Sequence, residues 1–219
     1  WFPVLCGVMV VLGLMGQVRA DVYPLKTRSW EVPVSLKEIG SRGGGIIELP
    51  MMVPRASLMY QYVHEQPLFG GMGENAPVFW PKGFKHQLGN HFIRGLRSAV
   101  RTQGPTHPFI PQDVSALRQQ GMRWIVLDRR VMMRVVAGSD WWSLRPDLRR
   151  EASQGAVGRI TAMVGSPVAV DGALVIWDID GGAVFPGDLA PTGQQIASED
   201  WMGMPWSAYE THLEALPKP

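Results

Sequence analysis

Two carboxylates at the end of an apolar run have the spacing in this sequence that comes nearest to a catalytic motif. Asp178 and Asp180 follow the run 174–177 and precede Gly181. In phosphoryl transfer through an aspartyl phosphate, the first Asp is the nucleophile, the second transfers the proton, and Mg²⁺ stabilises the transferred group. Here Gly182 stands where that motif has Thr, and only 37 residues follow to supply the other groups. We therefore interpret the pair as a plain strand end with solvated carboxylates.

The histidines do not have the spacing of metal ligands. His64-Glu65 lacks the second His of a His-Glu-x-x-His site, because Leu68 occupies that position. His86 and His91 are five residues apart, which places them off a single helical face. The sequence thus predicts no metal site, no cofactor and no catalytic residue in this chain.

A polar segment beside a pair of glycines holds the best candidates for ligand contact. Its side chains supply hydrogen-bond donors and acceptors next to a glycine-rich turn. The candidate ligand-binding residues are Tyr60, Gln61, His64, Glu65, Gly70 and Gly71. For His64 two roles remain open, contact with a substrate and hydrogen bonding that anchors a loop, and we favour the second.

The overall charge balance is too weak to indicate a nucleic-acid partner. The chain has 21 basic and 19 acidic residues, a net charge of +2. Arginine is concentrated locally, since nine Arg and no Lys lie between Asp113 and Arg159. A solvated helix face explains this stretch, and contact with lipid headgroups or an anionic lipid-linked donor is the alternative. The single cysteine, Cys6, cannot form an intrachain disulfide.

The apolar run at the start of the chain has two interpretations. Residues 1–16 carry no charge, and Gln17 and Arg19 end the run. The run is typical of the outer end of a transmembrane helix whose beginning lies upstream. It is also compatible with the core of a signal peptide that is cleaved after Val18-Arg19-Ala20.

The remaining sequence predicts helices that alternate with short strands. Glycine, proline and charge punctuate the segments, and apolar residues recur at helical or strand spacing. Helices are expected at 34–39, 86–100, 112–120, 144–163 and 208–216, strands at 46–49 and 124–127, an irregular loop at 67–85, and a hairpin at 168–177. The hairpin turn is expected at Asp171-Gly172, because both residues tolerate positive φ. The predicted fold class is α/β, a small mixed sheet with flanking helices and a C-terminal β-hairpin.

Four ordered motifs resemble the extracytoplasmic C-terminal region of bacterial multi-pass membrane glycosyltransferases of the GT-C type and of related multi-pass proteins. They cover roughly residues 1–180. The first motif comprises Pro33, Leu36, Gly45, Ile47, Glu48, Leu49 and Pro50, and the second Tyr60, Gln61, His64, Pro67 and Gly71. The third comprises Leu117, Gly121, Trp124, Ile125, Val126 and Leu127, and the fourth Gly165, Pro167, Val168, Asp171, Leu174 and Trp177. Met72, Glu74 and Asn75 depart from the family, which often has an aromatic residue and then Arg there.

The resemblance implies a membrane protein with its catalytic carboxylate far upstream of this stretch. It favours a truncated transmembrane helix at 1–18, a connector at 19–33, an extracytoplasmic α/β domain at 34–180 and a Gly-, Pro- and Trp-rich tail at 181–219. The implied location is the inner (cytoplasmic) membrane, with the domain on the periplasmic side. The implied partners are the lipid bilayer, a polyisoprenyl-phosphate-linked sugar donor and a glycan acceptor, without nucleic acid.

Two functional hypotheses follow. In the first, the chain is the C-terminal soluble domain of an integral-membrane glycosyltransferase-like protein and does not catalyse transfer on its own. In the alternative, it is a non-enzymatic binding module that is exported or anchored to the membrane. The second hypothesis predicts a signal peptide upstream, whereas the first predicts many membrane spans.

Overall fold

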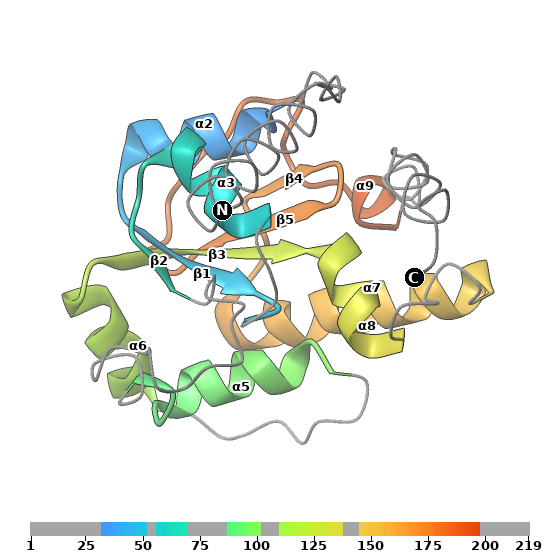
Figure 1. Ribbon diagram of the computed structural model, residues 1–219, viewed down its shortest axis with the longest axis horizontal. Coiled ribbons are helices and arrows are strands. Elements are labelled where there is room, and N and C mark those ends of the chain that lie inside the picture. The colour runs from blue at the N-terminus through green and yellow to red at the C-terminus, as the bar shows by residue number, and fades with distance from the viewer. Residues whose placement is uncertain (1–31, 52–55, 70–86, 102–109, 138–144, 198–219) are drawn as a thin grey trace, which may run out of the picture. The chain divides into compact units, whose positions relative to one another are not determined.

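The chain folds around a mixed five-stranded sheet with helices on both faces, as the computed structural model shows (Figure 1). The structure describes residues 32–51, 56–69, 87–101, 110–137 and 145–197. All of them lie within one unit that begins at Val32. The predicted segments 1–18 and 208–216, and most of the connector and of the 67–85 loop, lie outside the described residues.

The sheet combines a parallel half with an antiparallel hairpin. Its strands are β1 (Gly45–Leu49), β2 (Leu68–Phe69), β3 (Met122–Asp128), β4 (Ala169–Asp171) and β5 (Leu174–Asp178), in the order β2-β1-β3-β5-β4. Strand β1 pairs in parallel with both β2 and β3, and β5 is antiparallel to both β3 and β4. The predicted α/β class, with a small mixed sheet, flanking helices and a C-terminal hairpin, is confirmed.

The helices divide between the two faces of the sheet. Helices α2 (Val34–Arg42) and α3 (Ala56–His64) cover one face (Figure 1). The opposite face is covered by α5 (His91–Ala99), α6 (Pro111–Gln119), α7 (Arg129–Ala137) and α8 (Pro146–Val164). A short helix, α9 (Gly193–Ala197), follows the hairpin. Of these, α3, α7 and α9 were not predicted from the sequence. No helix in the described part of the chain is both long enough and apolar enough to cross a membrane.

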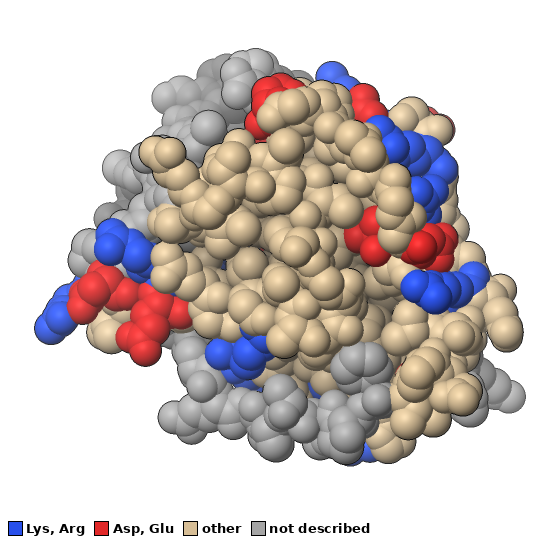
Figure 2. Space-filling view, turned by 180° about the vertical axis from the view of Figure 1, so that it is seen from behind, with Lys and Arg blue, Asp and Glu red and all other residues tan. Residues whose placement is uncertain are grey.

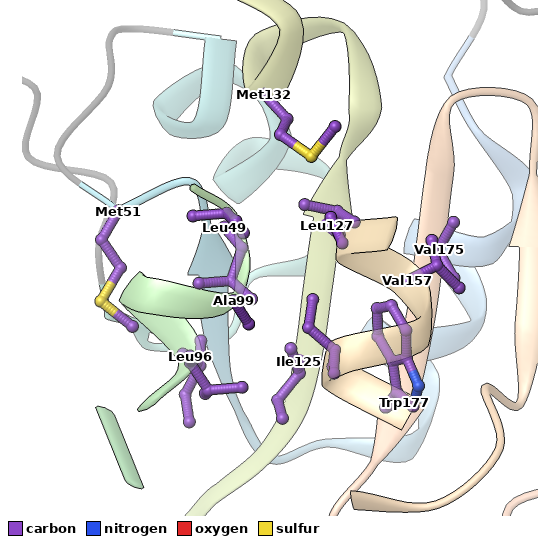
Figure 3. Packing of buried hydrophobic residues seen from close by; sticks show 14 of the residues in the cluster. Leu49, Met51, Leu96, Ala99, Ile125, Leu127, Met132, Val157, Val175 and Trp177 are labelled. Carbon is purple, nitrogen blue, oxygen red and sulfur yellow. The ribbon is translucent and has the colours of Figure 1, made fainter. Parts of the chain in front are cut away.

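Each face of the sheet has its own hydrophobic core, because successive strand residues point to opposite sides. On the α5–α8 side, Leu49, Ile125, Leu127 and Trp177 pack against helix residues such as Leu96 (Figure 3). On the other side a second cluster joins the remaining strand positions to α2 and α3; its members include Ile46, Trp124, Val126, Ile176, Leu36 and Ile39. Burial on both faces explains the continuous apolar runs that predict these strands.

Local hydrogen bonds set the element boundaries. Helix α5 begins at His91 and not at the predicted residue 86, because the Asn90 side chain accepts the N–H groups of Phe92 and Ile93 at 2.9 and 3.2 Å. The hairpin turn lies one residue later than predicted, since Asp171 pairs with Leu174 across the ladder. The turn residues are therefore Gly172, whose φ is 53°, and the residue that follows it.

The buried side chain of Arg129 fastens this hairpin to the rest of the fold. Its guanidinium donates to the carbonyl oxygens of Gly172 and Ala173 in the turn, and to that of Ile196 in α9 at 2.9 Å. At the same corner, the Asp171 carboxylate accepts the backbone N–H of Ser35 in the first turn of α2, at 3.0 Å. The hairpin is thus connected to elements on both faces of the sheet.

Candidate functional site

A cluster of four polar side chains lies at the carboxyl ends of the two central parallel strands. Glu48 is opposite Val126 in the β1–β3 register, and Asp128 is two residues further along β3. Both therefore point to the α2–α3 side of the sheet. Tyr60 of α3 and Arg130 at the start of α7 complete the cluster. Ligands of α/β proteins commonly bind at this edge of the sheet.

Asp128 organises the cluster through two sets of hydrogen bonds. Its carboxylate accepts the backbone N–H groups of Arg130 and Val131 at 2.9 and 3.4 Å, which caps the N-terminus of α7. The same carboxylate forms a bidentate pair with the Arg130 guanidinium, at 3.2 and 3.0 Å. The pair is mostly buried, because the side chain of Asp128 is 3% exposed and that of Arg130 is 21% exposed.

Arg130 connects the carboxylate to the phenol of Tyr60. One guanidinium nitrogen donates to the Tyr60 hydroxyl oxygen at 2.8 Å. Burial alone would lower the pKa of Arg130, but the charge and hydrogen bonds of Asp128, with a further contribution from Tyr60, raise it. Arg130 is therefore a permanent cation held between two helices and a strand.

The environment of Tyr60 keeps its hydroxyl protonated. Burial is the largest cause that raises its pKa above the ordinary value of 10.0, and the negative charge of Asp128 is the second. Arg130 opposes the shift, and the charge of Glu48 adds to it. A protonated phenol, a fixed guanidinium and two carboxylates can donate and accept hydrogen bonds. The four side chains together can therefore form hydrogen bonds with a polar ligand.

The residues predicted from the sequence to contact a ligand lie in different surroundings. Tyr60 belongs to the cluster, and Gln61 donates its side-chain N–H to the backbone oxygen of Gln66 at 3.3 Å. Glu65 is exposed and has a φ of 54°. Gly70 and Gly71 lie outside the described residues. Of the predicted residues that the structure describes, Tyr60 alone contacts the polar side chains at the strand ends.

His64 lies at the crossing of α2 and α3 and is 2% exposed. Its Nδ1 accepts the backbone N–H of Gln66 at 3.0 Å, and Gln66 in turn donates to the carbonyl oxygen of Gly40 at 3.3 Å. Burial lowers the pKa of His64 from 6.5 to about 4, so the ring is neutral at physiological pH. A Cβ atom on Gly40 would come within 3.0 Å of the His64 backbone. These contacts fit the anchoring role that we favour for His64.

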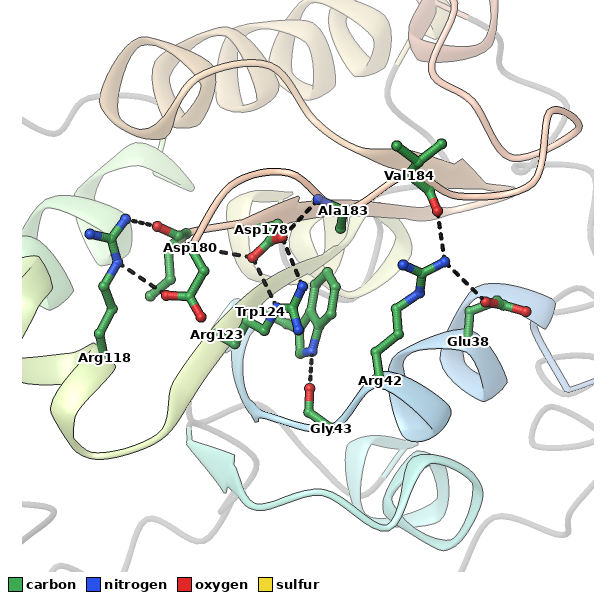
Figure 4. A network of polar contacts seen from close by, with 11 residues as sticks. Glu38, Arg42, Gly43, Arg118, Arg123, Trp124, Asp178, Asp180, Ala183 and Val184 are labelled. Carbon is green, nitrogen blue, oxygen red and sulfur yellow. Dashed lines mark hydrogen bonds and ion pairs between the residues drawn. The ribbon is translucent and has the colours of Figure 1, made fainter.

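The Asp178 and Asp180 pair belongs to a structural network at the opposite end of the sheet (Figure 4). Arg123 binds both oxygens of Asp178 at 3.2 Å, and the same carboxylate accepts the N–H groups of Asp180 and Ala183. Asp180 pairs with Arg118 at 3.2 Å. The expectation of solvated carboxylates is wrong for Asp178, whose side chain is fully buried, because the chain folds back over the strand end.

The segment after β5 is held against the α2 face by the neighbouring contacts. Arg42 donates to the carbonyl oxygen of Val184 at 2.6 Å and lies 5.0 Å from the centre of the Phe185 ring. Phe185 packs edge-on against Trp124, with the ring centres 5.8 Å apart. Leu189 is also buried, and its carbonyl oxygen accepts the N–H of Val170 at 2.9 Å. The first part of the 181–219 segment therefore completes the core of the domain.

Signals for the rest of the cluster are weak in the sequence. Glu48 belongs to the first of the four motifs, but an acidic residue inside an apolar strand does not by itself indicate a role. Asp128 and Arg130 follow an apolar strand directly, a position from which a side chain can reach the edge of the sheet. In the described part of the chain, no three His, Cys, Asp or Glu side chains gather in a way that could hold a metal ion.

The fold and the cluster define a class: an α/β domain with a mixed sheet and a polar side-chain cluster at the carboxyl ends of its parallel strands. Comparison with known proteins finds no matching family model, no matching curated protein and no matching solved structure.

Proposed function

We propose that the chain is the extracytoplasmic, non-catalytic C-terminal domain of a membrane glycosyltransferase-like protein. The proposed protein resides in the inner membrane and uses a sugar linked to polyisoprenyl phosphate. The domain lies on the periplasmic side, where the cluster of Glu48, Tyr60, Asp128 and Arg130 binds a hydroxyl-bearing part of the donor or of the glycan acceptor. Transfer itself takes place at residues outside this chain.

The observation that carries the proposal is the convergence of the motif residues. Glu48 comes from the first motif, Tyr60 from the second, and Asp128 follows the third directly, yet the three meet at one edge of the sheet. Residues far apart in sequence that converge on one polar cluster support a shared binding role. A sugar presents hydroxyl groups that donate to carboxylates and accept from guanidinium and phenol groups.

The location can be tested by labelling a single cysteine. Tyr62 is 88% exposed on α3, so Tyr62→Cys in a full-length background from which Cys6 and any other cysteine have been replaced by serine gives one accessible thiol. The full-length protein is expressed in a bacterial host and treated with a membrane-impermeant maleimide. The proposal expects labelling in intact cells. Labelling that occurs only after lysis would place the domain in the cytoplasm and overturn the proposal.

The activity can be tested with membranes that contain the full-length protein and undecaprenyl phosphate bearing a radiolabelled hexose or pentose. The proposal expects transfer that Tyr60→Phe weakens, because the variant removes only the hydroxyl that accepts from Arg130. Tyr62→Phe is the matched control, since it makes the same change on the same helix at an exposed position. If the domain is extracytoplasmic but no donor in the series is consumed, the chain is an exported binding module and the transferase assignment fails.

A further inference from the structure

Helix α5 and the turn that follows it carry three arginines. Arg94 and Arg97 are three residues apart on α5 and therefore lie on one side of the helix. Arg101 follows two residues after the helix ends, and its charge, like that of Arg94, acts on Arg97. The opposite side of α5 carries Phe92, Ile93, Leu96 and Ala99 and is buried in the core. The polar side of this helix thus carries positive charge without an acidic residue.

The positive charges of this face are not compensated within the described structure. Each ion pair that the structure describes joins an arginine to a carboxylate elsewhere, and none involves Arg94, Arg97 or Arg101. Burial and then the like charges of Arg101 and Arg94 lower the pKa of Arg97. By contrast, on the molecular face shown in Figure 2, acidic and basic atoms adjoin in several of the charged groups.

Arginines near the C-terminal end of α5 are not needed to bind the last carbonyl groups of that helix, because another residue binds them. Cations near a helix C-terminus bind its last carbonyl groups. Arg159 of α8 performs that role, because its guanidinium donates to the carbonyl oxygens of Ala99 and Arg101 at 2.9 and 3.2 Å. Arg159 also brings a fourth positive charge to this corner. Like charges at these spacings destabilise a helix, and no contact in the described structure offsets that cost.

We propose that the arginine face formed by Arg94 and Arg97 of α5 and by Arg101 just beyond the helix docks on the surface of a membrane that contains anionic phospholipid. Guanidinium groups bind phosphate oxygens in a bidentate manner, and the row of three matches a plane of phosphate-bearing headgroups. The apolar side of α5 remains in the core, so the contact is made with headgroups and does not insert the helix. This inference does not depend on the proposed sugar transfer.

The test measures the distance between this face and the headgroups in the full chain. A fluorophore is attached at Ser98→Cys, on α5 between Arg97 and Arg101, in a Cys6→Ser background. The protein is reconstituted in vesicles that contain a lipid with a nitroxide on its headgroup, made from phosphatidylcholine alone or from an equimolar mixture with phosphatidylglycerol. A label at Tyr62→Cys, on the opposite side of the sheet, is the positional control. Membrane attachment through any other segment of the chain would bring both labelled positions near the vesicle, so it would increase the quenching at position 62 as well as at position 98.

The proposal expects stronger quenching at position 98 than at position 62, and only in vesicles that contain phosphatidylglycerol. The quenching should also fall in roughly 1 M salt, because the Debye length there is about 3 Å and the attraction between charges is screened. Changing all three arginines to glutamine should reduce the ratio of docked to undocked molecules about a hundredfold, at about 1 kcal/mol for each basic residue. The charge-matched control is Lys37→Gln, Arg145→Gln and Arg150→Gln, which should retain the quenching; tryptophan fluorescence verifies that both triple variants fold.

Any one of four results would overturn the proposal. The first is equal quenching at positions 62 and 98, and the second is quenching at position 98 that is as strong in phosphatidylcholine alone. The third is an equal loss in the two triple variants, which would show that only net charge matters. If inorganic pyrophosphate shifts the fluorescence at position 98 and anionic vesicles do not, the face binds a soluble phosphate and the membrane assignment is wrong.

Discussion

Asp128 caps α7 and also holds Arg130, and two substitutions separate these contributions. Asp128→Ala removes the cap and the charged partner of Arg130, whereas Asp128→Asn keeps one oxygen that can accept the helix N–H groups. Loss of an N-cap costs about 1 kcal/mol. Loss of the charged hydrogen-bond partner costs about 2 kcal/mol, near the lower part of the range for charged groups because Arg130 is 21% exposed and can turn toward water. We expect the free energy of unfolding to fall by about 3 kcal/mol in the Ala variant and by about 2 kcal/mol in the Asn variant.

The assay is urea unfolding of the full chain at constant detergent, followed by tryptophan fluorescence, since Trp124 and Trp177 are fully buried. A double-mutant cycle that combines Asp128→Asn with Arg130→Ala should give a coupling energy of at least about 1 kcal/mol. Asp147→Ala is the control, because Asp147 also lies in the first turn of a helix but pairs with Arg145 where both side chains are largely exposed, and its stability should not change measurably. Equal losses in the Asn and Ala variants, or a coupling energy near zero, would refute the division into cap and charge pair.

Three further predictions concern other parts of the domain. His64 has a pKa of about 4 in the folded state and 6.5 in the unfolded state, so between these pH values the unfolded state binds more protons. The free energy of unfolding should therefore fall as the pH drops from about 6.5 toward about 4, by at most about 1.4 kcal/mol per pH unit. Unfolding measured across this range should show that His64→Gln removes the slope while the exposed His91→Gln retains it. Tyr60 has a raised pKa, so its contribution is complete below pH 10.0 and is lost above it; Tyr60→Phe should make the alkaline loss of stability shallower, and an unchanged alkaline profile relative to Tyr62→Phe would contradict this reasoning. Gly44 has a φ of 97°, and a Cβ atom added there would meet the Arg123 Cβ at 2.7 Å, so Gly44→Ala should lower the free energy of unfolding by about 1–3 kcal/mol. Gly158→Ala, in open space within α8, should raise the free energy of unfolding by about 0.5–1 kcal/mol, and thermal melting of the two variants checks both signs.

The elements that were predicted correctly carry their signals locally. Strand β1 lies between glycines and Pro50, α6 begins at Pro111 with Asp113 in its first turn, and the hairpin has Gly172 at its turn. Helix α7 was missed because β3 passes into it without Gly or Pro, and the one signal is the cap by Asp128. The one-residue error in the hairpin arose because Asp171 remains in the ladder.

The candidate site was only partly predictable for a different reason. Tyr60 was selected with five neighbours in sequence, but its polar partners belong to other elements. Arg130 lies 70 residues from Tyr60, and their contact depends on the parallel register of β1 with β3 and on the packing of α3 over that edge. A single sequence does not contain the strand register or the helix packing in readable form. It therefore allows Tyr60 to be selected but not its partners in the cluster.

The strand order has a consequence for the synthesis of the protein. Strand β3 is central in the sheet, but its second neighbour, β5, is translated about fifty residues later. At ordinary rates of about 5–20 residues per second, one edge of β3 lacks its neighbour for roughly 3–10 s in each nascent chain. An open strand edge that carries Trp124, Ile125, Val126 and Leu127 is a template for pairing with other chains. The ribosome-bound intermediate is therefore the form most exposed to aggregation, and the yield of folded protein should depend on chaperone capacity and on the speed of translation through the hairpin.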